Sequence, residues 1–276
     1  MTQSIIGFIG AGNMARSLAG GLLHNGWEKG RLILSDPDKQ QRQAVEKTLG
    51  VTVYPNNNEV AAQADILVLA VKPQILQSVS QELAATAQKK RPLIISIAAG
   101  IRIDDLQRWL GGGLPIVRAM PNTPALIAAG STGLFANTFT AELQRDQAES
   151  IVRAVGVAVW LPEERLLDVV TALSGSGPAY FFLIMEALER SAIELGLAPD
   201  IARLLTLETA YGAAKMALED GEDPAILRQR VTSPGGTTER ALQVLEAGQI
   251  RHLFNDALHA AEQRAGELAD LFGKGR

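Results

Sequence analysis

The chain has 276 residues, with 26 Lys and Arg against 30 Asp and Glu, and this net charge of −4 excludes a general basic surface for nucleic acid. Its 47% apolar content is typical of a globular core and excludes a disordered chain. Because there is no cysteine, disulfides, thiolate catalysis and cysteine-based zinc sites are excluded, and no metal site is expected. The longest apolar stretches, such as 92–101, run about ten residues, too short for a membrane span. With no signal peptide in the opening residues, we expect a cytoplasmic protein with no membrane partner.

Short apolar runs alternate with helical patterns through the first half of the chain. The predicted strands are 4–9, 31–35, 66–71, 93–98 and 116–120, with two more near 131–136 and 156–161. Helices are predicted over 13–25, 37–48, 74–88 and 140–154. Continuous apolar strands are typical of parallel sheets covered on both faces, so the pattern predicts a Rossmann-type doubly wound sheet.

Beyond residue 164 the strand pattern stops, and helices are predicted over 178–196, 199–219 and 249–271. We therefore predict a dinucleotide-binding domain over 1–164 and an all-helical domain over 165–276. The helix around 179–187 is apolar on almost every side, which indicates burial. We favour burial against a second subunit, so the helical domain would serve dimerisation; the alternative is packing within its own domain.

The first strand runs directly into Gly10-Ala11-Gly12-Asn13-Met14-Ala15, which fits the G-x-G-x-x-G/A dinucleotide fingerprint. Gly10 would allow the tight turn, Gly12 would let a pyrophosphate approach the backbone, and Ala15 would let the helix pack on the sheet. The helix N-terminus would then supply N–H donors and a positive dipole.

The end of the second strand bears on the choice of cofactor. Asp36 stands where an acid would hold the ribose 2′-hydroxyl of NAD, whereas Ser35 and Asn57 could hydrogen-bond the 2′-phosphate of NADP. Alternatively, Asp36 and Pro37 are only a helix N-cap followed by proline at the first helical position.

Three later strand ends add candidate cofactor contacts, because ligands bind at the carboxyl ends of parallel strands. Lys72 ends the fourth strand, small residues end the fifth, and Asn122 lies between two prolines after the sixth. The small residues would let a nicotinamide ring approach the backbone, and Asn122 could bond its carboxamide. The candidates are Ala70, Val71, Lys72, Pro73, Ile97, Ala98, Ala99 and Asn122.

Two Gly-rich runs in the helical half are candidates for a second site. One contains Ser174 and Ser176, and the other spans 232–239. Each could expose backbone N–H groups to a small carboxylate, although each alone is also compatible with an ordinary capped turn. Neither the three histidines nor the three tyrosines lie where a general base would be expected. Since oxidising an alcohol usually needs such a base and reducing an iminium does not, the inventory favours imine reduction.

Together these motifs resemble the pyrroline-5-carboxylate reductase family over essentially the whole chain. The segments that carry the resemblance are FIGAGNMA, LAVKP, ISIAAG, RAMPNTP, TALSGSGPAYFF and VTSPGGTTERAL. The resemblance implies reduction of 1-pyrroline-5-carboxylate to L-proline, the last step of proline biosynthesis, with NADPH or, as the alternative, NADH. It also implies a homodimer that can assemble into a decamer, a pentamer of dimers.

The resemblance further implies individual site residues. Cofactor contacts would include Ile9, Gly10, Ala11, Gly12, Asn13, Met14, Ser35 and Asn57, and the substrate carboxylate would meet Ser233, Gly236, Thr237 and Thr238. Thr171 would bond the ring nitrogen and, with Thr238, would be catalytic. Many relatives carry a neutral or basic residue where this chain has Asp36, which leaves the choice between NADPH and NADH open.

Two other functions fit the same pattern. A β-hydroxyacid dehydrogenase would need a catalytic lysine, for which Lys215 is the candidate. A nucleotide-binding regulator would bind the cofactor without turning over an imine.

Overall fold

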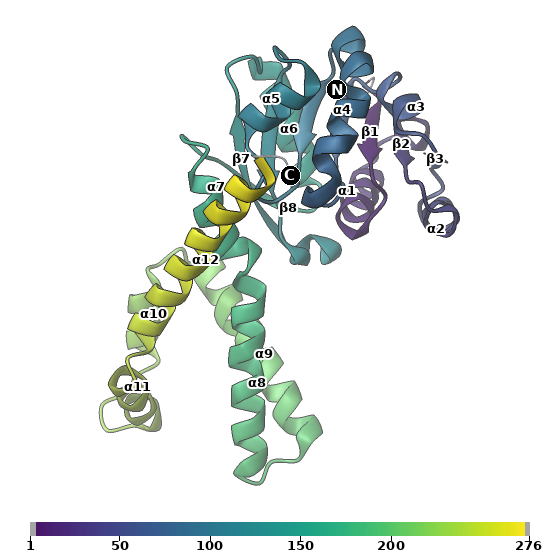
Figure 1. Ribbon diagram of the computed structural model, residues 1–276. Coiled ribbons are helices and arrows are strands. Elements are labelled where there is room, and N and C mark those ends of the chain that lie inside the picture. The colour runs from purple at the N-terminus through teal and green to yellow at the C-terminus, as the bar shows by residue number, and fades with distance from the viewer. Residues whose placement is uncertain (1–3, 274–276) are drawn as a thin grey trace. The chain divides into compact units, whose positions relative to one another are not determined.

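The computed structural model describes residues 4–273. Residues 6–160 contain an eight-stranded sheet in the order β3-β2-β1-β4-β5-β6-β7-β8, in which neighbours are parallel except for the antiparallel pair β6 and β7 (Figure 1). The strands are β1 (Ile6–Ile9), β2 (Leu32–Ser35), β3 (Thr52–Tyr54), β4 (Ile66–Leu69), β5 (Leu93–Ser96), β6 (Ile116–Met120), β7 (Gly130–Ala136) and β8 (Gly156–Trp160). The predicted doubly wound sheet is confirmed.

Helices cover both faces of this sheet, which explains the continuous apolar strands. On one face, Phe8 packs with Leu18 and Ile151; on the other, Leu67 packs with Leu83 and Leu106. The helices are α1 (Asn13–His24), α2 (Lys39–Leu49) and α6 (Glu142–Arg153) on the first face, and α3 (Asn57–Ala61), α4 (Pro73–Lys90) and α5 (Ile103–Leu110) on the second. Two 3₁₀ turns, η1 (Lys29–Arg31) and η2 (Thr123–Ile127), join strands and helices. The short elements β3, α3 and α5 are not among the ranges predicted from sequence.

The contacts divide the chain into two units, one of residues 1–176 with 260–276 and one of residues 177–259. This division differs from the predicted boundary at 164/165. Helix α7 (Leu166–Val170) and the π-helical turn η3 (Thr171–Gly175) belong with the sheet. Helix α7 packs closely on β7 at Gly133, where a Cβ would lie only 3.0 Å from the Val170 side chain.

The second unit is entirely helical among the described residues. It contains α8 (Gly177–Glu194), α9 (Pro199–Asp220), α10 (Pro224–Arg230), α11 (Thr237–Ala247) and the first part of α12 (Ile250–Gly273). The three long helices predicted from sequence are confirmed. Helix α10 begins after Asp223, whose side chain accepts a hydrogen bond from the backbone N–H of Ala225 at 2.7 Å.

This helical unit has no large apolar side chain in a buried position among its described residues; only Ala202 and Gly177 are buried there. Phe181, Phe182 and Leu183 on α8 are each about two-thirds exposed in the single chain. By length and composition alone, the helical stretch Leu166–Glu194 could also cross a membrane. The sequence-based expectation that no apolar stretch is long enough for a membrane span is therefore wrong. Exposed apolar area of this extent marks an interaction surface.

We expect the chain to self-associate through α8 and α9 because their apolar side chains need cover. Light scattering at micromolar concentration should give at least twice the chain mass of 29.4 kDa. Phe182→Asp should shift this mass toward the monomer, with circular dichroism confirming that the sheet domain stays folded. A wild-type monomer with full activity would contradict the prediction.

Candidate active site

The Gly-rich turn between β1 and α1 has the geometry of a phosphate cradle. Gly10 adopts φ +94°, and a Cβ there would lie 2.9 Å from the Ala70 carbonyl oxygen, so the position requires glycine. Gly12 is the N-cap of α1; no side chain among the described residues caps the helix, and a Cβ at Gly12 would meet no atom within 4 Å. The first-turn N–H groups of Asn13 and Met14 therefore have no capping side chain, at the positive end of the helix. These residues fit the pyrophosphate of a dinucleotide.

Ile9 and Ala11 in the same segment are buried, so only their backbone atoms can face a ligand there.

The carboxylate of Asp36 binds the Gly-rich turn directly. Its Oδ2 atom accepts the N–H of Ala11 at 3.1 Å, and its Oδ1 atom accepts the N–H of Asp38 at 2.9 Å. The simpler interpretation of Asp36 as a helix cap is wrong. Asp38 is the N-cap of α2, where its side chain accepts the N–H of Gln40 at 2.7 Å.

Ser35 is fully buried, and its hydroxyl donates to the Oδ1 atom of Asn57 at 2.8 Å. This bond leaves the Asn57 amide nitrogen, a donor only, as the group that a phosphate could reach. Ser35 ends β2, one residue before Asp36, and Asn57 is the first residue of α3.

The ends of β4 and β5 hold the other predicted cofactor contacts. Lys72 is the exposed N-cap of α4, with Pro73 at the first helical position. Behind it, the N–H of Ala70 donates to the Ile9 carbonyl, which ties the strand end to the Gly-rich turn. In the loop after β5, Ala98 is buried whereas Ile97 and Ala99 are half-buried.

Asn122 makes different contacts from the predicted one. Its side chain is nearly buried, donates to the Ser174 carbonyl at 3.0 Å and accepts the N–H of Ser131 at 2.8 Å. It therefore joins the end of β6 to the turn η3.

The first Gly-rich run of the helical half forms the π-helical turn η3 rather than an open anion nest. Thr171 donates its hydroxyl proton to the Leu167 carbonyl at 2.7 Å, and Ser174 donates to the Val170 carbonyl at 3.0 Å. The N–H of Ser176 donates to the Thr171 carbonyl at 2.8 Å. With its proton used, the Thr171 oxygen can still accept a hydrogen bond from a ligand N–H. π-helical turns are frequent at functional sites.

The second Gly-rich run, in the other unit, is a tight turn that leads into α11. Gly235 has φ +72°, and the N–H of Gly236 donates to the Ser233 carbonyl at 3.0 Å. Gly236 is the N-cap of α11 and has no side-chain cap bond among the described residues, while the Glu239 carboxylate accepts the N–H of the preceding Gly235 at 2.8 Å. As at α1, a helix of more than two turns begins with glycine and free N–H groups, here those of Thr237 and Thr238. A carboxylate fits this arrangement.

The sequence interpretation missed a charge cluster beside η3. The Arg118 guanidinium, 7% exposed, binds Glu164 at 2.7 Å, and the same Glu164 oxygen accepts the N–H of Ile103 at 2.8 Å. Burial raises the pKa of the nearby Asp168 carboxyl, although Arg118 and Arg102 act to lower it. No spacing signal in the sequence links these residues, because strand, loop and helix bring them together only in the fold.

Lys215, the candidate base of a dehydrogenase, lies exposed on α9 beside Glu219 at 3.7 Å.

Two family models match the chain. The model for pyrroline-5-carboxylate reductase dimerisation matches residues 164–268, and the model for NADP oxidoreductase, coenzyme F420-dependent, matches residues 5–100.

Similar proteins cover the chain almost completely. The pyrroline-5-carboxylate reductase of Pseudomonas aeruginosa is 48% identical over 99% of this chain and all of that protein, and the one from Synechocystis is 41% identical over 95% and 97%. The structure of the enzyme from Coxiella burnetii superposes with a TM-score of 0.93 at 47% identity, covering 97% of this chain and 99% of that one. The structure of the Plasmodium falciparum pyrroline carboxylate reductase, solved with NADP bound, superposes with a TM-score of 0.87 at 30% identity. The match covers 98% of this chain and 99% of that one.

These matches extend over both units and include the Gly-rich cradle and both Gly-rich runs of the helical half. The chain therefore belongs to the pyrroline-5-carboxylate reductase family and is an oxidoreductase that reduces 1-pyrroline-5-carboxylate to L-proline with a nicotinamide cofactor.

Proposed function

We propose that the site residues divide the work of this reaction between the two Gly-rich helix starts. The N-terminus of α1 binds the cofactor pyrophosphate, and Asn57, oriented by Ser35, donates to the 2′-phosphate of NADPH. The loop Ile97–Ala99 lies against the nicotinamide, where the small side chains of Ala98 and Ala99 allow close approach. A bound nicotinamide cofactor supplies the hydride that reduces the C=N bond.

The substrate carboxylate binds the N-terminus of α11 of the dimer partner, a second copy of this chain, with donors from Ser233, the backbone N–H of Thr237, and Thr238 of that copy. Thr171 accepts the iminium N–H, because its own proton is held by the Leu167 carbonyl. This contact fixes the ring nitrogen, while the hydride adds to the neighbouring carbon and removes the positive charge. Ser174 and Ser176 shape the turn around Thr171. Placement and fixed dipoles carry the rate without a strong base.

The observation that carries this assignment is the pair of uncapped, glycine-led helix starts, one for each anion of the reaction. Binding of 2′,5′-ADP and of L-proline tests it separately for each site. Gly12→Val should abolish the first and spare the second, whereas Thr238→Val should weaken only proline. Loss of both ligands in either variant would contradict the division.

Asp36 should set the choice between NADPH and NADH. A carboxylate held at the Ala11 N–H repels a 2′-phosphate bound nearby at Asn57. Asp36→Asn should raise the NADPH/NADH ratio of kcat/KM by roughly three- to thirtyfold, the range expected for removing one like charge near the surface. Asp38→Asn, which also removes a charge but keeps a good N-cap, is the matched control and should leave the ratio unchanged.

An unchanged ratio in Asp36→Asn would show that the carboxylate only holds the Gly-rich turn.

We also propose three properties of the whole protein on the basis of the sequence. The functional boundary lies at 164/165, the dimers assemble into a decamer, and the enzyme is cytoplasmic. The start of the dimerisation family model at residue 164 supports the first of these.

A further inference from the structure

The loop after β5 rests on the end of the C-terminal helix, although the two lie some 170 residues apart in the chain. Gly100 closes the loop with φ +69°, and a Cβ at this position would lie 3.4 Å from the ring of Phe272 and 3.5 Å from the backbone nitrogen of Ala269. Ala269 is only 1% exposed. The last turns of α12 therefore pack directly on the backbone that follows Ile97–Ala99.

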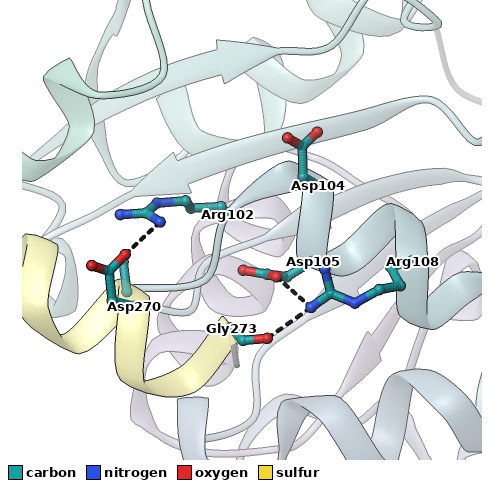
Figure 2. Close-up of a pocket in the computed structure, with 7 residues that line it drawn as sticks. Arg102, Asp104, Asp105, Arg108, Asp270 and Gly273 are labelled. Carbon is teal, nitrogen blue, oxygen red and sulfur yellow. Dashed lines mark hydrogen bonds and ion pairs between the residues drawn. The ribbon is translucent and has the colours of Figure 1, made fainter. Parts of the chain in front are cut away.

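Charged groups hold this end of α12 against α5, as Figure 2 shows. Arg102, the residue before α5, pairs with Asp270 at 2.7 Å, and Arg108 donates to the Gly273 carbonyl at 2.7 Å while pairing with Asp105 at 2.6 Å. A Cβ at Gly273 would lie 2.5 Å from the Asp105 carboxylate, so the helix end packs closely against this side chain. These contacts surround a small polar cavity of about 410 Å³.

The same loop is fixed from its other side by the charge cluster described above. Glu164 accepts the N–H of Ile103 and binds the buried Arg118. At the start of the loop, the N–H of Ile97 donates to the Leu69 carbonyl at 3.2 Å. Between these two anchors, Gly100 lies against Phe272 and Ala269, while Arg102 pairs with Asp270 and its carbonyl accepts the N–H of Leu106 at 3.2 Å. The end of α12 is therefore in direct contact with the middle of the loop.

We propose that the last turn of α12, Asp270–Gly273, is a positioning element that holds the loop Ile97–Gly100 at the nicotinamide end of the cofactor. The inference rests on the proposed contact between this loop and the nicotinamide. It makes a helix that begins in the helical unit a determinant of hydride-transfer geometry in the sheet unit. Small displacements of reacting groups are costly, since a shift of about 1 Å can reduce the rate by roughly a hundredfold.

The test uses the full-length enzyme with three variants. Phe272→Ala removes the packing on Gly100, and Asp270→Asn removes the ion pair while preserving shape. Asp104→Asn is the matched control, because Asp104 lines the same cavity but makes no ion pair among the described residues. For each variant, stopped-flow oxidation of NADPH and of its 4-deuterated form gives the hydride-transfer rate and isotope effect, and 2′,5′-ADP binding reports the adenosine half of the site.

Phe272→Ala should slow hydride transfer by roughly ten- to a hundredfold and raise the isotope effect on kcat, with 2′,5′-ADP affinity within about twofold of wild type. Asp270→Asn should act in the same direction but less, because ion pairs this exposed contribute little. Asp104→Asn should match wild type. If Phe272→Ala does not fold by circular dichroism, Phe272→Leu and Asp270→Asn carry the test.

Unchanged hydride transfer in the folded Phe272 and Asp270 variants would overturn the inference, as would an equal loss in Asp104→Asn. Failure of the proposed site assignment has a different readout that does not depend on α12: Gly12→Val and Thr238→Val would then fail to separate 2′,5′-ADP binding from L-proline binding.

Discussion

Gly12→Val is expected to abolish cofactor binding while leaving the fold intact. Nothing lies within 4 Å of a Cβ at Gly12, and its extended backbone suits any residue, so the free protein has room for valine. The branched side chain would occupy the space in front of the uncapped N–H groups of α1. We expect the Kd for NADPH to rise at least roughly a hundredfold, or about 2.7 kcal/mol. Quenching of intrinsic fluorescence by NADPH measures this directly.

The matched control is Gly20→Val, which adds the same side chain to the same helix away from the cradle. A Cβ at Gly20 would lie 3.7 Å from the Leu49 side chain, an ordinary contact. This control should bind NADPH like wild type. Normal NADPH affinity in Gly12→Val would remove the Gly-rich turn from the cofactor site.

Thr171→Val should lower kcat/KM for the imine by roughly ten- to a few-hundredfold, the effect of one positioned hydrogen bond of about 1.5–3 kcal/mol. The variant loses the oxygen that we assign to the ring nitrogen. It also loses the bond from Thr171 to the Leu167 carbonyl, a local bond that threonine makes in many helices. Stability should therefore fall slightly, and NADPH affinity should not change.

Thr48→Val separates the two effects. Thr48 makes the same kind of bond, to the Ala44 carbonyl at 2.6 Å, on the remote helix α2. It should lose similar stability and no activity. If Thr171→Val, like Thr48→Val, lowered the stability but left kcat/KM unchanged, Thr171 would have only a structural role. The assignment of Thr171 to the substrate nitrogen would then be wrong.

Much of the fold could be predicted from the sequence because its signals are local and strong. The continuous apolar strands and the Gly10–Ala15 fingerprint specify a parallel sheet and its first turn almost unaided. The short elements β3, α3 and α5 lack such a signal. The strand β3 has only three residues, and helices of five to eight residues, such as α3 and α5, owe their stability to packing.

The segment Asp36-Pro37-Asp38 shows where local rules run out. Both acids can cap a helix, and only the distance to Ala11 decides that Asp36 serves the Gly-rich turn while Asp38 serves α2. The Ser174–Gly177 run has the same difficulty. Its composition indicates an open turn, yet the structure has a π-helical turn over Thr171–Gly175. Gly175 in this turn packs so closely on Met120 that a Cβ there would lie 2.8 Å from the methionine methyl group. Asn122 and Glu164 act through long-range contacts that no spacing reveals.

The most direct test of the reaction is a single turnover with 4-deuterated NADPH and 1-pyrroline-5-carboxylate, followed by mass spectrometry of the product. Hydride addition to the carbon of the C=N bond predicts L-proline with one deuterium at C5, formed in step with cofactor oxidation. Cofactor oxidation without deuterated proline, or no turnover of the imine at all, would contradict the account.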